Sequence, residues 1–337
     1  MALNEDLQLI STPPERDPYR IYLSDEYPDP ENLLQYGESG TLPMGEITAI
    51  AGKAKTGKSF AVSILVASVL GCKDFAFIHD RENAKVLYFD TEQGDCYVAR
   101  IIRRIHKLLG WDIRTDSPQL IPYKLREQPQ EERFNFILDK VSEFEPNLIV
   151  IDGIADLVFD FNDVRESTEM VVKLLDMCSR FDVAILTVLH ENKSKEDRNM
   201  KGHLGTMLLQ KCASVFHLEK KGDTYTVTNT DCRNRPIEAF AFLIDDAGLP
   251  RTVEAMAQQA NEAKERMEIE DIRNVLAEIF AENDRLLYTQ IKKAYMEKDR
   301  VSEKTAKRRI DRAKELGILA VSGGIYTLCP DTSKPPN

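Results

Sequence analysis

The chain has 337 residues, of which 42% are hydrophobic and 8% aromatic, and its formal net charge is −11. This length can bury a full α/β core and leave room for a second, smaller domain. The negative charge argues against a protein coated in nucleic acid, and no apolar run approaches the ~20 residues that span a bilayer, so no membrane contact is expected.

Residues 1–40 are rich in Pro, Asp and Glu and lack periodicity, which predicts an irregular N-terminal arm. Its first residues have neither the basic nor the apolar stretch of a secretory signal, so they are not expected to act as one. The six cysteines are scattered, without a C-x-x-C pair. We therefore expect reduced cysteines in a cytoplasmic protein, and no disulfide framework or zinc site.

Residues 41–250 alternate apolar runs with amphipathic patterns. Helices are predicted over 97–110 and 133–144, and a third follows residue 58. The near-continuous apolar runs are typical of strands buried on both faces. These patterns predict an α/β domain with a mostly parallel twisted sheet and an antiparallel edge. The predicted strands are 46–51, 85–90, 120–123, 148–152, 184–189, 214–219, 224–229 and 240–245.

The segment AGKAKTGKSF, residues 51–60, contains the pattern G-x-x-x-x-G-K-[ST] between the first strand and the next helix. Glycines let backbone amides close around a phosphate at a helix N-terminus, where anions are stabilised. Lys58 would reach the β- and γ-phosphates of ATP, and the Ser59 hydroxyl would bind Mg²⁺. The alternative is a lysine-rich turn without a ligand. The predicted ATP-binding residues are Gly52, Lys53, Ala54, Lys55, Thr56, Gly57, Lys58, Ser59 and Phe60.

Two acidic residues at strand ends complete the predicted site. Asp152 ends an apolar strand, where a carboxylate can hold Mg²⁺ through water; otherwise it only caps the following turn. Glu92 lies just beyond another strand, facing the same crevice as Lys58. Glu92 could polarise the attacking water as a general base, with Asp90 as the nearby rival. The alternative for Glu92 is a surface residue at a helix start, which the helix dipole favours.

The loop, followed in order by VLYFDTEQ, LIVIDG and ILTVLHENK, resembles the RecA-like ATPase core over about residues 35–250. Within that group it is similar to the DnaB-type and RepA-type hexameric helicases of plasmids and mobile elements. The resemblance implies that His190 senses the γ-phosphate, unless it is a buried core histidine. It also implies that Arg233, in DCRNRP, acts as a finger in the next subunit's site, or else is a plain surface arginine. Asp231 stands where the family usually has lysine, which Arg235 could replace.

Two segments are candidates for DNA contact. In the resembled family, loops after the sensor strand line the ring channel and grip single-stranded DNA. Residues 190–206 hold this position as a polar loop of mixed charge with no aromatic for base stacking, so a solvated loop is an equal alternative. The candidate contacts in this loop are Lys193, Lys195, Arg198 and Lys201.

The second candidate is a compact unit at residues 266–328, after a helical linker at 251–265 and before a disordered tail at 329–337. It holds three helical patterns and a hairpin turning at Gly323-Gly324, which resembles a winged helix. The third helix, 302–317, has net charge +3 and would enter the major groove of duplex DNA. The alternative is a winged helix used for protein contact. The candidate DNA contacts are Lys304, Lys307, Arg308 and Arg309.

These features favour a Mg-ATP-dependent, ring-forming motor that translocates on or unwinds DNA for a plasmid or mobile element. Single-stranded DNA would pass through the homo-oligomeric ring, and the winged helix would hold duplex. The main alternative is an ATP-switched DNA-binding regulator that never translocates. A small-molecule kinase fits less well, because no acceptor-pocket motif is evident and the winged helix would have no role.

Overall fold

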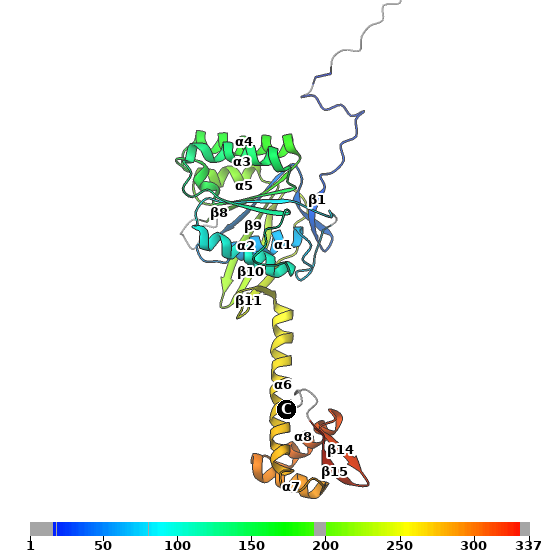
Figure 1. Ribbon diagram of the computed structural model, residues 1–337. Helices are drawn as coiled ribbons and strands as arrows, with labels where there is room; N and C mark the ends of the chain where they lie inside the picture. The colour runs from blue at the N-terminus through cyan, green and yellow to red at the C-terminus, as the bar shows by residue number, and fades with distance from the viewer. Residues whose placement is uncertain (1–15, 18, 80, 192–199, 331–337) are drawn as a thin grey trace, which may run out of the picture.

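A large twisted sheet forms the centre of the fold (Figure 1). The computed structural model describes residues 16–17, 19–79, 81–191 and 200–330. Within these residues the sheet has nine strands, in the order β12-β11-β10-β9-β3-β8-β7-β5-β6. The parallel strands are β3 (Ile47–Gly52), β5 (Val86–Asp90), β6 (Leu120–Lys124), β7 (Leu148–Asp152), β8 (Ala184–His190) and β9 (Ser214–Lys221).

The antiparallel edge follows at one side of this sheet. It consists of β10 (Thr224–Cys232), β11 (Phe240–Ile244) and β12 (Pro250–Thr252). Every strand predicted between residues 46 and 245 therefore forms, with ends displaced by a few residues. The core is therefore an α/β domain with a mostly parallel sheet and an antiparallel edge, as the sequence predicts. Because β3, β5, β7 and β8 run in one direction, their carboxyl ends meet along one edge of the sheet.

Helices cover both faces of the sheet. α1 (Lys58–Val69) and α2 (Asp95–Leu109) pack in the core on one face. α3 (Gln130–Phe144), α4 (Val164–Phe181) and α5 (Gly202–Lys211) pack on the other face, as Figure 1 shows. A short 3-10 helix, η1 (Ile154–Leu157), follows β7. The polar loop predicted over 190–206 therefore ends earlier than expected, because α5 begins at Gly202 and buries Leu204.

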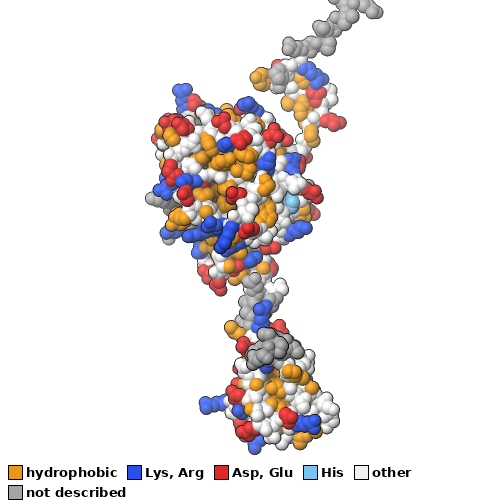
Figure 2. All heavy atoms as spheres, viewed as in Figure 1, with side chains coloured by type: hydrophobic (Ala, Val, Ile, Leu, Met, Phe, Trp, Pro, Cys, Tyr) orange, Lys and Arg blue, Asp and Glu red, His pale blue; other side chains and the backbone are white. Residues whose placement is uncertain are grey.

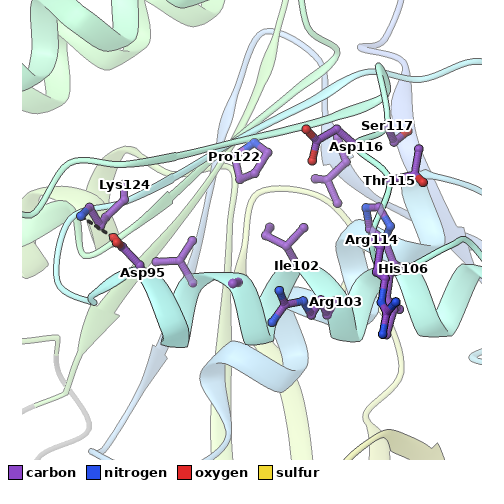
Figure 3. Close-up of a pocket in the computed structure, with 14 residues that line it drawn as sticks. Asp95, Ile102, Arg103, His106, Arg114, Thr115, Asp116, Ser117, Pro122 and Lys124 are labelled. Carbon is purple, nitrogen blue, oxygen red and sulfur yellow. Dashed lines mark ion pairs between the residues drawn. The ribbon is translucent and has the colours of Figure 1, made fainter.

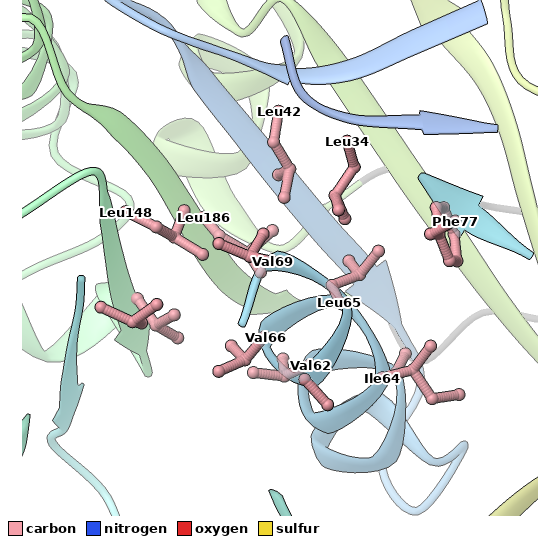
Figure 4. Packing of buried hydrophobic residues seen from close by; sticks show 14 of the residues in the cluster. Leu34, Leu42, Val62, Ile64, Leu65, Val66, Val69, Phe77, Leu148 and Leu186 are labelled. Atoms are coloured by element: carbon pink, nitrogen blue, oxygen red, sulfur yellow. The ribbon is translucent and has the colours of Figure 1, made fainter. Parts of the chain in front are cut away.

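The N-terminal arm differs from the predicted irregular segment at residues 32–40. β1 (Asn32–Tyr36) and β2 (Ser39–Pro43) form an antiparallel sheet with β4 (Phe77–Ile78). Figure 4 shows Leu34 and Leu42 pointing toward α1, and both are fully buried. These strands form because their leucines cover the outer face of a helix that is apolar all round.

A long helix leads from the core to a separate C-terminal unit (Figure 1). α6 (Val253–Ile279) begins directly after β12, and its last turns pack in the core of this unit. The predicted linker and the predicted first helix are therefore one continuous helix. The other elements are β13 (Leu286–Leu287), α7 (Tyr288–Asp299), α8 (Glu303–Glu315), β14 (Leu319–Ser322) and β15 (Ile325–Leu328).

The hairpin between β14 and β15 turns where the sequence predicts it. Gly323 has φ of 59° and Gly324 has φ of 83°, values that suit a tight two-residue hairpin turn. A small apolar core centred on Ile291, Tyr295 and Ile310 holds the three helices together. In the predicted tail, residues 331–337 lie outside the described part of the chain.

The surface is mixed in charge. On the face in Figure 2, basic, acidic and apolar side chains are interspersed over the core. None of the helices in the described ranges combines the length and apolarity needed to cross a membrane. All six cysteines have free thiols in this structure.

Candidate nucleotide site

The loop between β3 and α1 has the backbone that the phosphate-binding pattern predicts. Gly57 has φ of 86° and precedes the first residue of α1. A Cβ at Gly57 would lie 2.6 Å from Cδ1 of Tyr225, and one at Gly52 would lie 3.2 Å from the carbonyl of Leu218. Both glycines are therefore required by close packing. The loop ends at the N-terminus of α1, a position that favours a bound anion.

Lys58 lies inside the curve of this loop. Its Nζ donates to the carbonyl oxygens of Gly52 and Lys53, at 2.8 Å each, and lies 3.0 Å from Nδ1 of His190. Burial lowers the pKa of Lys58 to about 8, against the opposing attraction of nearby carboxylates, Asp152 first among them. The ammonium is thus held at the loop by weak acceptors that phosphate oxygens can replace with stronger, charge-assisted bonds.

Asp152 ends β7 beside this loop. Its Oδ2 accepts a hydrogen bond of 2.7 Å from the hydroxyl of buried Tyr88. Burial, and then the charge of Asp90, raise the pKa of Asp152 to about 7. A carboxyl in this environment would be stabilised in its charged form by a cation.

The residues present fit a magnesium ion. Mg²⁺ usually takes one or two protein oxygens and completes its shell with phosphates and water. Ser59, at the start of α1, and Asp152 supply such oxygens. Within the described residues no group of three or more His, Cys, Asp and Glu side chains could hold a metal. With Ser59 and Asp152 as protein ligands, a bound ion would complete its shell with nucleotide phosphates and water.

Asp90 and Glu92, the two rivals for the general base, have different surroundings. The Oδ1 of Asp90 accepts the backbone N–H groups of Glu92 and Gln93, at 3.0 and 2.7 Å, and its Oδ2 accepts the Gln93 amide at 2.9 Å. Asp90 is fully buried and holds the turn after β5. Both carboxylate oxygens of Asp90 therefore already accept hydrogen bonds that hold this turn.

Glu92 projects toward β7. A Cβ at Gly153 would come within 2.8 Å of Cγ of Glu92, so the two strand ends are in close contact. Partial burial raises the pKa of the Glu92 carboxyl, helped by Asp156 and Asp90, while Lys58 opposes the rise. Thr91 ties the ends together by donating to the carbonyl of Gly153 at 2.8 Å. Of the two carboxylates, Glu92 is the one placed to meet water.

His190 ends β8 and contacts Lys58, as described above. Because an ammonium can only donate, Nδ1 of His190 accepts, so the proton of the neutral ring is on Nε2. Burial and then the Lys58 charge lower the pKa of His190. A neutral imidazole at the end of β8 can therefore respond when Lys58 changes its position.

Arg233 lies at the other end of β3 from the phosphate-binding loop of its own chain. It donates to the carbonyl of Lys211 at 2.7 Å and lies 3.4 Å from the carboxylate of Glu46, just before β3 begins. The loop lies at the opposite end of β3. Arg235 instead pairs with Glu38 at 2.9 Å, and both are exposed. Neither arginine serves the nucleotide site within one chain.

Of the four candidate DNA contacts in the loop after β8, the structure describes one. Lys193, Lys195 and Arg198 lie outside the described residues, and Lys201 is the exposed residue before α5, 4.4 Å from the ring centre of Phe161.

In the C-terminal unit, exposed Lys304 and Lys307 line a shallow surface of α8 with Arg308. Arg308 pairs with Glu268 of α6 at 3.1 Å. Arg309 is mostly buried against Asp271 and Asp299. These ion pairs neutralise its charge inside the unit and disfavour a DNA contact by Arg309, which stays a prediction.

Sequence reasoning missed Arg104 of α2. This buried guanidinium donates to the Ser59 carbonyl at 3.3 Å and lies 3.7 Å from the ring centre of Phe60. It thus supports the first turn of α1. A signal was available, because Arg104 falls on the apolar face that Ile101 and Ile105 define.

A groove of about 330 Å³ lies elsewhere, between α2 and β6. Figure 3 shows Arg114 and His106 at one end of this groove and the ion pair of Lys124 with Asp95 at the other. It contains none of the residues predicted for the nucleotide site.

A protein family and a solved structure are similar to parts of this chain. The protein family described as "AAA domain" matches residues 20–196, which include the loop, Glu92, Asp152 and His190. The solved structure described as "ATPase Domain of G40P" is similar with a TM-score of 0.48 and 12% sequence identity, covering 62% of this chain and 84% of that chain. No curated protein matches the chain.

Proposed function

The chain belongs to the AAA domain family and carries a P-loop ATPase site, and from this premise we propose that it hydrolyses Mg-ATP while acting on DNA. The proposed form is a ring-forming helicase or translocase that serves the replication or transfer of a plasmid or mobile element. The observation that carries the proposal is the contact of Lys58 with His190, because it joins the phosphate loop to the strand that leads toward a candidate DNA loop.

Each residue of the nucleotide site has its own proposed role in ATP hydrolysis. The loop amides and Lys58 bind the phosphates, while Ser59 and Asp152 would hold Mg²⁺, which neutralises phosphate charge when bound. Glu92 orients a water molecule and accepts its proton as the water oxygen bonds to the γ-phosphorus. The bond from that phosphorus to the β–γ bridging oxygen breaks, so ADP and phosphate leave.

The position of Arg233 favours an oligomer. An arginine can stabilise the charge that spreads over the γ-phosphoryl oxygens, but only within hydrogen-bond reach. In its own chain Arg233 lies near Glu46, at the opposite end of β3 from the loop. A finger role therefore requires a neighbouring subunit, as a ring would supply.

The C-terminal unit is proposed as a winged helix that binds duplex DNA. Its element order, α6, β13, α7, α8 and a hairpin, supports this assignment. Lys304 and Lys307 are the side chains of α8 best placed for phosphates, since the neighbouring arginines already have acidic partners. Lysine contacts to phosphate would position the protein without reading sequence.

A regulator that uses ATP only as a switch is the second candidate. It is favoured by one observation: the C-terminal unit has its own core and is joined to the ATPase core through α6. In that case duplex binding would respond to ATP, and hydrolysis would not respond to single-stranded DNA.

The deciding experiment measures ATP hydrolysis with and without single-stranded DNA, alongside native mass. The motor predicts several-fold stimulation, a ring-sized mass, and loss of hydrolysis in Lys58→Ala. A monomer whose hydrolysis ignores DNA would refute it.

A further inference from the structure

An ion bridge next to the nucleotide site joins the residue after β8 to β9 and β10. Nδ1 of His217, on β9, lies 3.2 Å from Oε1 of Glu191, and Nε2 lies 2.7 Å from Oδ2 of Asp231 on β10. The side chains of His217 and Glu191 are 9% and 7% exposed, whereas that of Asp231 is 47% exposed. An imidazole with a carboxylate on each nitrogen donates from both, which requires the charged ring.

The surroundings of His217 favour that charge. The hydrogen bond with Glu191 raises the pKa of His217 above its usual value, against burial, and Asp231 adds to the rise. The neighbour in register on β3 is Ala51, which carries no charge. The pKa of His190 shifts in the opposite direction, because burial and the charge of Lys58 lower it. The pKa values of two histidines near one loop are thus shifted in opposite directions.

The bridge is joined directly to the nucleotide site. Glu191 follows His190 in the chain, and its backbone N–H donates to the carbonyl of Gly52, the first glycine of the loop, at 3.2 Å. Lys58 donates to the same carbonyl at 2.8 Å. A shift of Glu191 would therefore disturb both the loop and the position of His190.

The acidic side chain at position 231 suits the bridge, because Asp231 is a partner of His217. A lysine at this position would repel the imidazolium. The acidic residue is therefore matched to the histidine, two positions before Arg233.

We propose that His217 is a positioning residue for the nucleotide site, whose imidazolium, held by Glu191 and Asp231, fixes the end of β8 so that His190 meets Lys58. The inference rests on the proposed ATPase function. Without His217, the carboxylate of Glu191 would remain buried and unpaired, a costly arrangement that moves or neutralises the group. Displacing catalytic groups by about 1 Å can slow a reaction ~100-fold.

Kinetics of the full-length protein test this role. His217→Gln should lower kcat about 10- to 100-fold with little change in KM, since the loss concerns alignment and not nucleotide binding. Asp231→Asn should have a smaller effect, because Glu191 keeps its partner. His203→Gln, the same change on α5, is the matched control and should equal wild type. The wild-type rate should also fall as pH rises through the pKa of His217, and His217→Gln should lack this part of the fall and keep only the loss due to Lys58, whose pKa is about 8.

Nitrogen NMR of histidine-labelled protein gives a readout independent of turnover. The chain has five histidines, which single substitutions can assign. At pH 7 His217 should show two protonated ring nitrogens, and His190 should show only Nε2 protonated. In His217→Gln or Asp231→Asn the His190 signals should shift, whereas in His203→Gln they should stay.

The outcomes separate the two proposals. If wild type hydrolyses ATP and folded His217→Gln keeps its kcat, the positioning role is refuted and the ATPase stands. If wild type does not hydrolyse ATP, the proposed function is refuted. The NMR spectra then provide the remaining test of the positioning role of His217. A neutral His217, or unmoved His190 signals in both bridge variants, overturns the inference in either case.

Discussion

Replacing Glu92 with glutamine separates the two carboxylates at the end of β5. Glutamine keeps the shape of the side chain but cannot accept the proton of the attacking water. A positioned general base contributes about 10²- to 10⁴-fold to a rate, so kcat for ATP should fall by that factor. This loss corresponds to ~3–5 kcal/mol of activation free energy. ATP affinity should stay near wild type, because Glu92 makes no contact that holds the loop.

Asp90→Asn is the matched control, two residues away. Asparagine still accepts the two backbone N–H groups, but it loses the charge and the favourable contact with the Gln93 amide. Hydrogen bonds to charged groups contribute ~1.5–3 kcal/mol, so the free energy of unfolding should fall by about that amount. The rate per folded molecule should change much less than in Glu92→Gln.

The assay combines steady-state hydrolysis, binding of a fluorescent ATP analogue and urea unfolding. The reasoning is refuted if Asp90→Asn loses more kcat than Glu92→Gln while its stability is unchanged. It is also refuted if Glu92→Gln hydrolyses ATP at the wild-type rate.

Two further changes test the loop and the C-terminal unit. In Gly57→Ala the alanine must adopt a φ of 86° and displace Tyr225. The backbone strain alone should lower the free energy of unfolding, measured with urea, by ~1–2 kcal/mol. Overpacking should add ~1–3 kcal/mol. Gly110→Ala, where φ is 68° and nothing lies within 4 Å, should show only the first loss, and equal losses would contradict the packing argument. Lys307→Ala should weaken duplex binding on every sequence and reduce the salt slope by about one, as titrations at several salt concentrations would show. Arg309→Ala should instead lower the thermal stability of the C-terminal unit, and unchanged binding in Lys307→Ala would argue against DNA contact by α8.

Much of the nucleotide site could be predicted from sequence because its signals are local. The loop pattern occupies eight consecutive residues between a buried strand and an apolar helix. Glu92 and Asp152 each follow an apolar strand, and parallel strands bring such ends together without further information. His190 was expected at the site only because of the family resemblance, and it lies at the end of β8, in contact with Lys58.

Other elements had weaker or longer-range signals. β1 and β2 are short, hold Gly and Pro, and depend on packing against α1, which no local pattern reveals. α4 was missed although its signal was present, because Asp163 caps the helix by accepting the N–H of Glu166 and Met170, Leu174 and Met177 share its buried face. A cap followed by apolar residues at helical spacing is sufficient to predict such a helix.

The ion bridge could not be predicted from the sequence. Glu191 and Asp231 lie on either side of His217 in the chain, 26 and 14 residues away. They meet only because β9 pairs with β3 and because the register of β10 shifts between Thr228 and Asp231. Register of this kind depends on the whole sheet.

Calorimetric titration of the protein with ATP in the presence of Mg²⁺ tests the central claim most directly. The account predicts saturable binding of one nucleotide per chain, lost in Lys58→Ala and weakened when Mg²⁺ is removed. Absence of binding in wild type, or equal affinity in Lys58→Ala, would contradict it.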